Sequence, residues 1–225
     1  MNFKHVIIVT YGRSGSTLLQ GILNSIDDLL VKGENFNFCY GLYQSYINLK
    51  KLTRKGAKTT SITRPFYGAC EFDEKVFLAD AYALLESQIV THGEKIPVWG
   101  FKEIRYLPAA ISVGGGYQLQ PYLSFLDKLL PECGFVFLTR DHEEVSSSGF
   151  WESVSKEKVQ RNLVAFEKEA NEWSAHKKNS YWLTYSDIID SRLIDLYDFL
   201  GADYSRKKIE NILSVEYSYN NKIIK

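Results

Sequence analysis

The sequence predicts an α/β protein with three layers, α/β/α, around a central, mainly parallel sheet. Four short apolar runs have the length and composition of strands that are buried on both faces. Segments with apolar residues at helical spacing separate these runs, and strands that alternate with helices form parallel sheets covered on both sides. Ligands of such sheets bind beyond the carboxyl ends of the strands, so we expect the functional site there. The predicted strands are residues 6–9, 98–101, 135–138 and 181–183.

Helical periodicity is clearest in two segments. Residues 73–91 carry apolar side chains at helical spacing and open with acidic residues, which suit the amino end of a helix. In 157–177 the apolar residues recur three or four positions apart between charged ones, which predicts an amphipathic helix. Segments 54–72 and 112–117 are predicted to be loops, either at the rim of the site or elsewhere on the surface. The other predicted helices are residues 17–26, 40–53, 119–130, 142–152, 191–200 and 205–213.

The bulk composition narrows the class of protein. A chain of 225 residues with 45% hydrophobic residues and no internal repeat or linker suits one domain, residues 1–225. Lys plus Arg equals Asp plus Glu at 27 each, so no net charge favours nucleic acid or an anionic membrane. The three cysteines lack the spacing of a zinc site or a disulfide framework, which favours a reducing compartment. Because the apolar runs are short, we expect no signal peptide and no integral membrane segment, hence a soluble, cytoplasmic protein whose oligomeric state is open.

The segment TYGRSGSTL joins the first predicted strand to the first predicted helix, which is the position of a phosphate-binding loop. A Walker A loop, G-x-x-x-x-G-K-[ST], matches here at Gly15 and Thr17. Ser16 stands in place of its lysine and Thr10 in place of its first glycine. What remains is a helix amino terminus with hydroxyl groups and one cation, Arg13, which suits an oxyanion without a metal. The alternative is a glycine-serine turn that only begins a helix.

These residues resemble a known family. The motif GRSGSTLL is similar to the 5′-phosphosulfate-binding loop of sulfotransferases that use 3′-phosphoadenosine 5′-phosphosulfate (PAPS), especially small soluble bacterial-type members of the carbohydrate and protein-tyrosine branches. The resemblance implies a P-loop-type α/β/α fold, with PAPS as co-substrate and no metal requirement. It also implies that the 5′-phosphosulfate contacts Arg13, Ser14, Gly15, Ser16, Thr17 and Leu18.

A second motif, FVFLTRDHEEVSSSGFW, resembles the 3′-phosphate motif of the same family, in which a strand ends in Arg-Asp and a serine follows. Here these residues are Arg140 and Ser148, while His142 stands where the family usually has proline. An arginine at a strand end and a serine about two turns along the next helix can converge on one phosphate. The segment WLTYSDIIDSRLIDLYDFLG is similar to the family's strand, acidic turn and FLG helix, and Lys222 in the tail could close over the nucleotide.

Sulfonyl transfer requires charge stabilisation on the departing phosphate, a base for the acceptor proton and in-line alignment of the reactants. By resemblance Arg13, together with Ser16, Thr17 and the loop amides, has the first role. The GE pair that follows the first helix is similar in place to the catalytic glutamate of the glycan and protein-tyrosine branches, which nominates Glu34 as the base. A surface glutamate in a turn is the alternative. The four histidines stand in no matching motif: His5, His92, His142 and His176.

The stretch VWGFKEIRY places Lys102, Glu103 and Arg105 at the predicted carboxyl end of a strand, which faces the ligand crevice. Lys102 could contact the sulfonate or the acceptor, and Glu103 is the second candidate for the base. The resemblance to sulfotransferase-like sequences is less specific here, and a charged, exposed strand end is the alternative.

Aromatic and basic residues follow Glu34 and are candidates for acceptor binding. Aromatic rings stack on sugars or phenols, and the basic group could attract an anionic acceptor. The alternative is that Tyr43 and Tyr46 are core positions of one helix and the lysines its solvated end. With the neutral bulk charge, these residues favour a hydroxyl-bearing acceptor such as a carbohydrate, glycolipid or small phenol over a long polyanion. The aromatic residues are Phe36, Phe38, Tyr40, Tyr43 and Tyr46, and the basic ones are Lys50, Lys51, Arg54, Lys55 and Lys58. We expect the acceptor to contact Glu34, Phe36, Tyr40, Glu103 and Arg105.

These patterns predict a PAPS-dependent sulfotransferase that transfers a sulfonyl group to a hydroxyl or amine. Two other functions stay open: a kinase-like P-loop phosphotransferase with a degenerate loop, and a non-catalytic nucleotide-binding relative. The missing lysine, and the lack of a clear second carboxylate for magnesium after a strand, disfavour the phosphotransferase.

Overall fold

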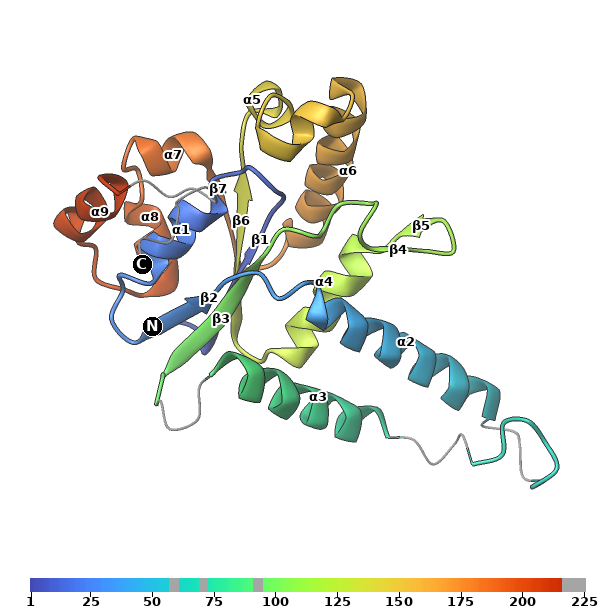
Figure 1. The fold of residues 1–225 in the computed structure, drawn as a ribbon. Helices are drawn as coiled ribbons and strands as arrows, with labels where there is room; N and C mark the ends of the chain where they lie inside the picture. Colours follow the sequence, from blue (N-terminus) through green and yellow to red (C-terminus); the bar gives the residue numbers. More distant parts are fainter. Residues whose placement is uncertain (57–60, 69–72, 91–94, 216–225) are drawn as a thin grey trace, which may run out of the picture.

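The computed structural model describes residues 1–56, 61–68, 73–90 and 95–215. The strands of its central sheet are β1 His5–Val9, β2 Leu29–Lys32, β3 Val98–Glu103, β6 Cys133–Thr139 and β7 Ser180–Thr184. They are parallel and lie in the order β2-β3-β1-β6-β7 (Figure 1). The three central strands are almost entirely buried, because helices cover both faces of the sheet.

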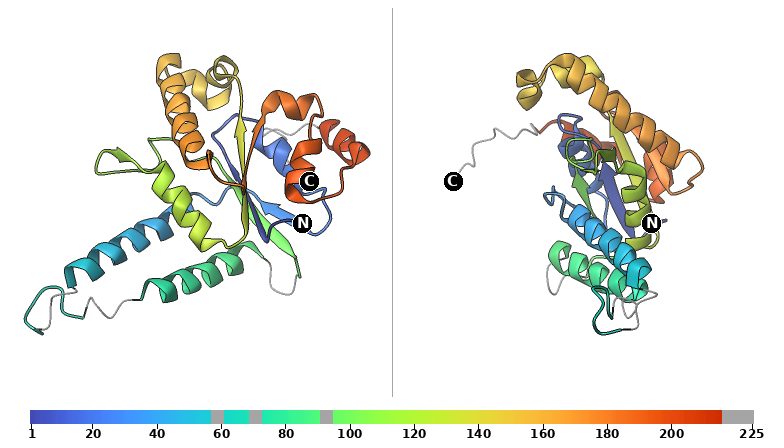
Figure 2. Two further views of the ribbon diagram at one scale, coloured as in Figure 1. Left: turned by 180° about the vertical axis from the view of Figure 1, so that it is seen from behind. Right: turned by 90° about the vertical axis from the view of Figure 1, so that its right-hand side faces the viewer.

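Helices pack on both faces of the sheet. They are α1 Ser16–Leu23, α2 Phe38–Gly56, α3 Glu74–Ile89, α4 Leu119–Leu129, α5 His142–Ser146, η2 (a 3₁₀ helix) Gly149–Ser153, α6 Lys156–Ser174, α7 Tyr185–Ile189, α8 Ile194–Leu200 and α9 Arg206–Leu213. Ile7 and Val9 of β1 enter the core under α2, α3, α4 and α6. The alternate residues Val6 and Ile8 enter a second core under α1, α8 and α9. Figures 1 and 2 show the two groups of helices on opposite sides of the strands, which confirms the predicted α/β/α layers.

The sequence pattern predicts four strands of the central sheet and misses β2. This strand lies at one edge of the sheet and has only four residues. Its sequence, LLVK, offers only three consecutive apolar residues, and its side chains alternate between buried and half-buried, unlike those of the central strands.

The helix predicted at 142–152 is wrong. α5 ends at Ser146, and a 3₁₀ helix follows it only after a break. The break arises because Ser148 has an extended backbone, with φ −129°, and Gly149 has a left-handed one, with φ 60°. In the last third of the chain α8 begins three residues later than predicted, and the short helix α7 was not expected from the pattern.

The glycine segment 112–117 is an ordered turn and not a plain loop. It forms the antiparallel strands β4 Ser112–Val113 and β5 Gly116–Tyr117. Gly114 and Gly115 connect them with positive φ values of 60° and 80°, which other residues rarely adopt. In the segment 54–72, α2 continues to Gly56, and the parts 57–60 and 69–72 lie outside the described residues.

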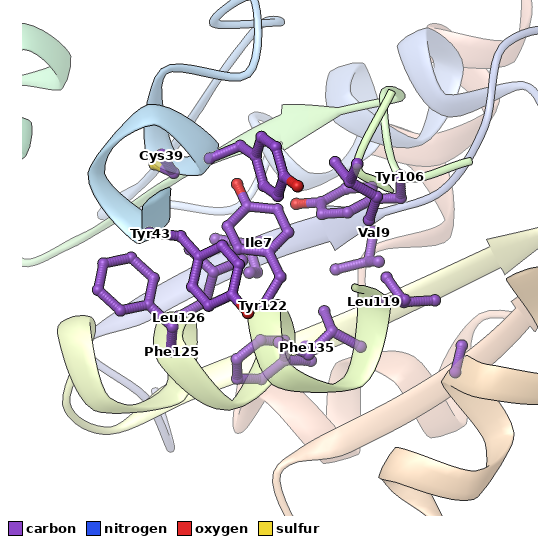
Figure 3. Packing of buried hydrophobic residues seen from close by; sticks show 14 of the residues in the cluster. Ile7, Val9, Cys39, Tyr43, Tyr106, Leu119, Tyr122, Phe125, Leu126 and Phe135 are labelled. Atoms are coloured by element: carbon purple, nitrogen blue, oxygen red, sulfur yellow. The ribbon is translucent and has the colours of Figure 1, made fainter. Parts of the chain in front are cut away.

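Three tyrosines of α2 face the core. Tyr40, Tyr43 and Tyr46 are 7%, 2% and 4% exposed. Tyr43 packs on Tyr122 and Phe125 of α4 (Figure 3). The structure therefore agrees with the alternative that Tyr43 and Tyr46 are core positions of one helix. Tyr40, expected to contact the acceptor, also lies in the core and not at an open surface. Beyond this contact α2 and α3 extend together away from the sheet (Figure 1).

Gly100 in β3 gives a first prediction. A Cβ at this position would lie 1.7 Å from the carbonyl oxygen of Val6 in β1, so any side chain would push two central strands apart. We expect Gly100→Ala to lower the free energy of unfolding by about 3 kcal/mol or more, as measured by urea denaturation. Gly41→Ala is the matched control, because Gly41 is exposed on α2 and a Cβ there meets nothing within 4 Å. The free energy of unfolding of the control should rise by about 0.5–1 kcal/mol, because alanine favours a helix more than glycine does. Equal stability of the two variants would contradict the prediction.

Candidate active site

The turn after β1 is a strand-loop-helix unit of the P-loop type. Two of its residues have left-handed backbone conformations, Arg13 with φ 72° and Gly15 with φ 90°. Gly15 caps α1 and has no room for a side chain, because a Cβ would lie 2.3 Å from the Tyr185 ring. The backbone N–H groups ahead of Leu18 have no partner within the helix. This end of α1 is therefore suited to bind an anion.

The hydroxyl groups of the loop differ in their exposure. Thr17 is exposed and Ser16 is 6% exposed, whereas Ser14 is fully buried. The Ser14 hydroxyl has no hydrogen-bond partner within the part of the chain that the structure describes. Thr17 is thus the hydroxyl group of this loop that a ligand can reach most directly.

The two sequence motifs lie side by side, because β1 and β6 are neighbours in the sheet. Arg13 Nε donates to Ser148 Oγ at 3.0 Å, and Arg140 Nη1 donates to the Arg13 carbonyl at 3.2 Å. Trp151 Nε1 of η2 donates to the Gly12 carbonyl at 3.0 Å. Ser148 reaches the loop from the extended residue before η2, and not from a second helical turn as expected. Arg13, Arg140 and Ser148 nevertheless form one connected group.

A buried tyrosine fixes the carboxyl end of β6. Tyr11 Oη accepts from the Arg140 N–H at 3.0 Å and lies 3.2 Å from both the Arg140 carbonyl oxygen and Glu167 Oε1. Burial raises the pKa of Tyr11 above its ordinary value, so the hydroxyl stays protonated and can donate. His142 Nε2 lies 2.9 Å from the same Glu167 oxygen. His142, in place of the family's proline, therefore links the start of α5 to α6.

Arg140 lies at the wall of a cavity of about 500 Å³. Its Nε donates to Glu144 Oε2 at 2.8 Å, and its guanidinium lies 4.2 Å from the centre of the Tyr185 ring. The Glu144 side chain is 55% exposed, and an ion pair with so exposed a partner contributes little and exchanges easily for another anion. The cavity is lined in part by Arg140, His142, Glu144, Glu167, Tyr185 and Ser186.

The carboxyl ends of β2 and β3 bring four charged residues together. Glu34 Oε1 accepts from Lys102 Nζ at 3.1 Å, and Glu34 Oε2 accepts from Arg105 Nη1 at 3.0 Å. Arg105 Nη1 also donates to Glu103 Oε1 at 2.8 Å. Lys102 Nζ lies 3.4 Å from Thr17 Oγ1, which connects this group to the loop. We call Glu34, Lys102, Glu103 and Arg105 the charged cluster; its two cations balance its two carboxylates.

Two exposed aromatic rings accompany these groups. Phe36 is 83% exposed, and the Arg105 guanidinium lies 4.1 Å from the centre of its ring. Phe150 of η2 is 55% exposed and covers Gly12, where a Cβ would lie 2.4 Å from the ring. Exposed rings beside polar groups are suited to stack on a ring-shaped ligand.

The remaining sequence candidates lie elsewhere. His5 begins β1, at the opposite end of the sheet, and burial lowers its pKa to about 4. His176 is exposed in the turn after α6. His92, Lys58 and Lys222 lie outside the described residues. Among the residues that the structure describes, no group of three or more His, Cys, Asp or Glu is arranged to hold a metal ion, and no helix is long and apolar enough to cross a membrane.

A comparison with models of known protein families shows to which family the chain belongs. The model of the sulfotransferase family matches residues 5–205, which is most of the chain. The chain belongs to the sulfotransferase family. A search of curated proteins gave no match to this sulfotransferase.

Three solved structures are similar to this chain, and one of them supports the fold. The sulfotransferase domain from the curacin biosynthetic pathway is 13% identical to this sulfotransferase, with a TM-score of 0.54 over 94% of this chain and 78% of that chain. Retinol dehydratase in complex with androsterone and the inactive cofactor PAP (3′-phosphoadenosine 5′-phosphate) is 15% identical, with a TM-score of 0.42 over 93% of this chain and 63% of that chain. A mouse sulfotransferase complexed with PAP is 11% identical, with a TM-score of 0.46 over 93% of this chain and 62% of that chain. The first of these shows the same fold.

The residues of this site that were not predicted from the sequence include Tyr11, Phe150, Trp151 and Tyr185. Tyr11 and Tyr185 follow β1 and β7 closely, and a position just past the carboxyl end of a parallel strand is a signal that could have found them. Phe150 and Trp151 lie in a segment whose pattern predicts a helix, so nothing in the sequence indicated that their side chains contact the loop.

Proposed function

We propose that this sulfotransferase uses PAPS and transfers its sulfonyl group to a hydroxyl or amine of a glycan, glycolipid or small molecule, with Glu34 as the general base. The observation that carries the proposal is the hydrogen bond between Arg13 and Ser148, because it joins the loop and the second motif into one site. We take residues 1–225 to act as one sulfotransferase domain. The cytoplasmic location expected from the sequence stays a prediction.

The residues around the loop suit a nucleotide with two separate phosphate groups. Arg140 and Ser148 would hold the 3′-phosphate, and Arg13 with Ser16, Thr17 and the loop amides would hold the 5′-phosphosulfate. Arg140 is suited to this role because a phosphate can replace Glu144 and accept charge-assisted hydrogen bonds from the planar guanidinium. The adjoining cavity, about 500 Å³, has the volume of a small-molecule site.

The charged cluster suits the transfer step. The acceptor oxygen forms the new bond to sulfur, the bond from sulfur to the phosphate oxygen breaks, and the acceptor proton passes to Glu34. The electron pair of the broken bond stays on the phosphate, where Arg13 and the N–H groups of the loop stabilise it. Lys102 lies between Thr17 and Glu34 and so contacts both sides of the reaction.

A neutral, ring-bearing acceptor fits the surroundings of Glu34 best, and we favour a carbohydrate. The two cations of the charged cluster are paired with its two carboxylates, so little positive charge is left to attract a polyanion. Phe36 offers an exposed ring beside Glu34. Lys50 pairs with Glu74 at 3.7 Å, on the part of α2 that extends away from the sheet (Figure 1), so the basic end of α2 has no part in this proposal.

Nucleotide binding tests the proposal. We expect PAP (3′-phosphoadenosine 5′-phosphate) at about 100 times its Kd to stabilise the protein by about 2.7 kcal/mol, or roughly 5–10 °C in Tm for a chain of this size. ATP with magnesium should shift Tm by less than about a fifth of this. A thermal-shift titration with both ligands measures the difference.

Each other outcome identifies one of the alternatives. Stabilisation by ATP with magnesium alone would overturn the proposal in favour of a phosphotransferase. Stabilisation by PAP without turnover of PAPS on a library of glycans, glycolipids and phenols would indicate a non-catalytic relative.

A further inference from the structure

Glu103 is the least exposed member of the charged cluster. It is the last residue of β3, and only 1% of its side chain is exposed. Oε1 accepts from the N–H groups of Ile104 at 2.8 Å and Arg105 at 3.2 Å, as well as from the Arg105 guanidinium. Oε2 accepts from the N–H groups of Asn35 at 3.3 Å and Asn37 at 2.8 Å. A carboxylate offers about four acceptor directions, so these contacts leave none for a substrate proton.

We infer that Glu103 is a positioning residue that holds Glu34 in place and is not itself the base. The inference rests on the proposed function, because it assigns the proton transfer to Glu34. It also removes Glu103 from the candidates for acceptor contact, since the side chain is buried under the turn that follows Glu34.

Glu103 acts on Glu34 first through the backbone of the turn that follows Glu34. Its Oε2 holds the N–H groups of Asn35 and Asn37, and Phe36 and Asn37 have left-handed φ values of 56° and 62°. Asparagine tolerates this conformation, but it is unfavourable for Phe36 and persists there only where the surroundings hold it. Without the buried carboxylate, Asn35 and Asn37 lose the acceptor of their N–H groups. The turn then loses the hydrogen bonds that keep the Glu34 side chain directed at Lys102.

Glu103 also reaches Glu34 by a side chain. Its Oε1 orients the Arg105 guanidinium, which donates to Glu34 Oε2 and covers the Phe36 ring. Glu34 lies between β2 and α2 and belongs to neither, so its direction depends on these neighbours. Proton transfer needs the base within hydrogen-bond reach of the acceptor, and a displacement of about 1 Å can lower the rate about a hundredfold.

The test is a double-mutant cycle in the full chain with Glu103→Gln and Glu34→Gln. We expect Glu103→Gln to lower kcat about tenfold or more and to change the Kd for PAP less than about twofold. In the Glu34→Gln background the same substitution should change kcat less than about twofold, because it acts through Glu34. Multiplicative losses of the two single variants, or an unchanged kcat in Glu103→Gln, would overturn the inference. Glu132→Gln is the matched control, a glutamate that pairs with Lys4 on the surface.

A second readout does not depend on activity. Amide hydrogen exchange at Asn35 and Asn37 should be at least about tenfold faster in Glu103→Gln, whereas exchange at Ile7 in β1 stays the same. Unchanged exchange at both asparagines would overturn the inference even if PAP binds and the proposed function stands. Faster exchange without PAP binding would support the role of Glu103 in holding the turn and would contradict the proposed function alone. If Glu103→Gln fails to fold, Arg105→Gln removes only the side-chain route. It should lower kcat in the native background and have almost no effect in Glu34→Gln, and an equal loss in both would contradict positioning.

Discussion

Arg140→Ala is expected to weaken the binding of PAP by about 10- to 150-fold, because it removes at least one charged hydrogen bond to the 3′-phosphate, and such bonds contribute about 1.5–3 kcal/mol. Arg140 directly follows β6, and Tyr11 contacts both its backbone N–H and its carbonyl oxygen, so the loss reflects the side chain and not a displaced strand. Isothermal titration of PAP into the two proteins measures the effect. Adenosine 5′-monophosphate, which lacks the 3′-phosphate, should bind both proteins with nearly equal affinity.

Arg206→Ala is a matched control for this substitution. Arg206 Nε donates to Glu210 at 2.8 Å on α9, as Arg140 Nε donates to Glu144 at 2.8 Å at α5, so both variants break the same kind of contact. The control should bind PAP like the native chain. An Arg140→Ala protein with native affinity for PAP would show that the 3′-phosphate is bound elsewhere.

Glu34→Gln is expected to lower kcat by about 10²- to 10⁴-fold, which is the usual contribution of a general base. The amide keeps the size of the side chain, but its single oxygen can accept from only one of Lys102 and Arg105, and it cannot take up the acceptor proton. Affinity for PAP should change less than about twofold, because Glu34 lies on the acceptor side of Thr17. Initial rates at saturating PAPS, together with PAP titrations, measure the two quantities.

Glu132→Gln serves as the control here as well, since it makes the same chemical change in a surface ion pair with Lys4. If Glu34→Gln keeps the native kcat, the base is another group, although the family assignment would stand. A loss confined to KM would instead place Glu34 among the residues that bind the acceptor.

The fold was largely predictable because its signals are local. A strand buried on both faces is apolar over most of its length, and β1, β3 and β6 each contain such a run, although β3 ends in Lys102 and Glu103. β2 lies at the edge and offers only three consecutive apolar residues. The break between α5 and η2 depends on the left-handed backbone of Gly149, which packs against the Arg13 side chain. A contact between residues so far apart in the chain leaves no periodic pattern.

The candidate site was predictable where a motif lies at a strand end and not where packing decides. Arg13, Arg140 and Ser148 were nominated from two separate motifs, and the parallel register of β1 and β6 brings them together. Tyr40 and Glu103 could not be assigned from residue type alone. The residue type does not tell a tyrosine that stacks on a sugar from one that packs in a core. Only the position of Tyr40 on the inner face of α2 shows that it belongs to the core. Glu103 needed the backbone N–H groups of a distant turn to reveal its partners.

The position of Lys102 has a consequence for the timing of charge changes. Its side chain is 7% exposed, and its ammonium group contacts the Glu34 carboxylate and lies 3.4 Å from the Thr17 hydroxyl. In the proposed mechanism Glu34 becomes neutral when it takes up the acceptor proton, so Lys102 no longer faces an anion on that side. The positive charge of Lys102 would then act on the departing phosphate. One cation would thus compensate the negative charge that disappears on the acceptor side and the negative charge that appears on the nucleotide side, so that the local charge of the site would stay nearly constant.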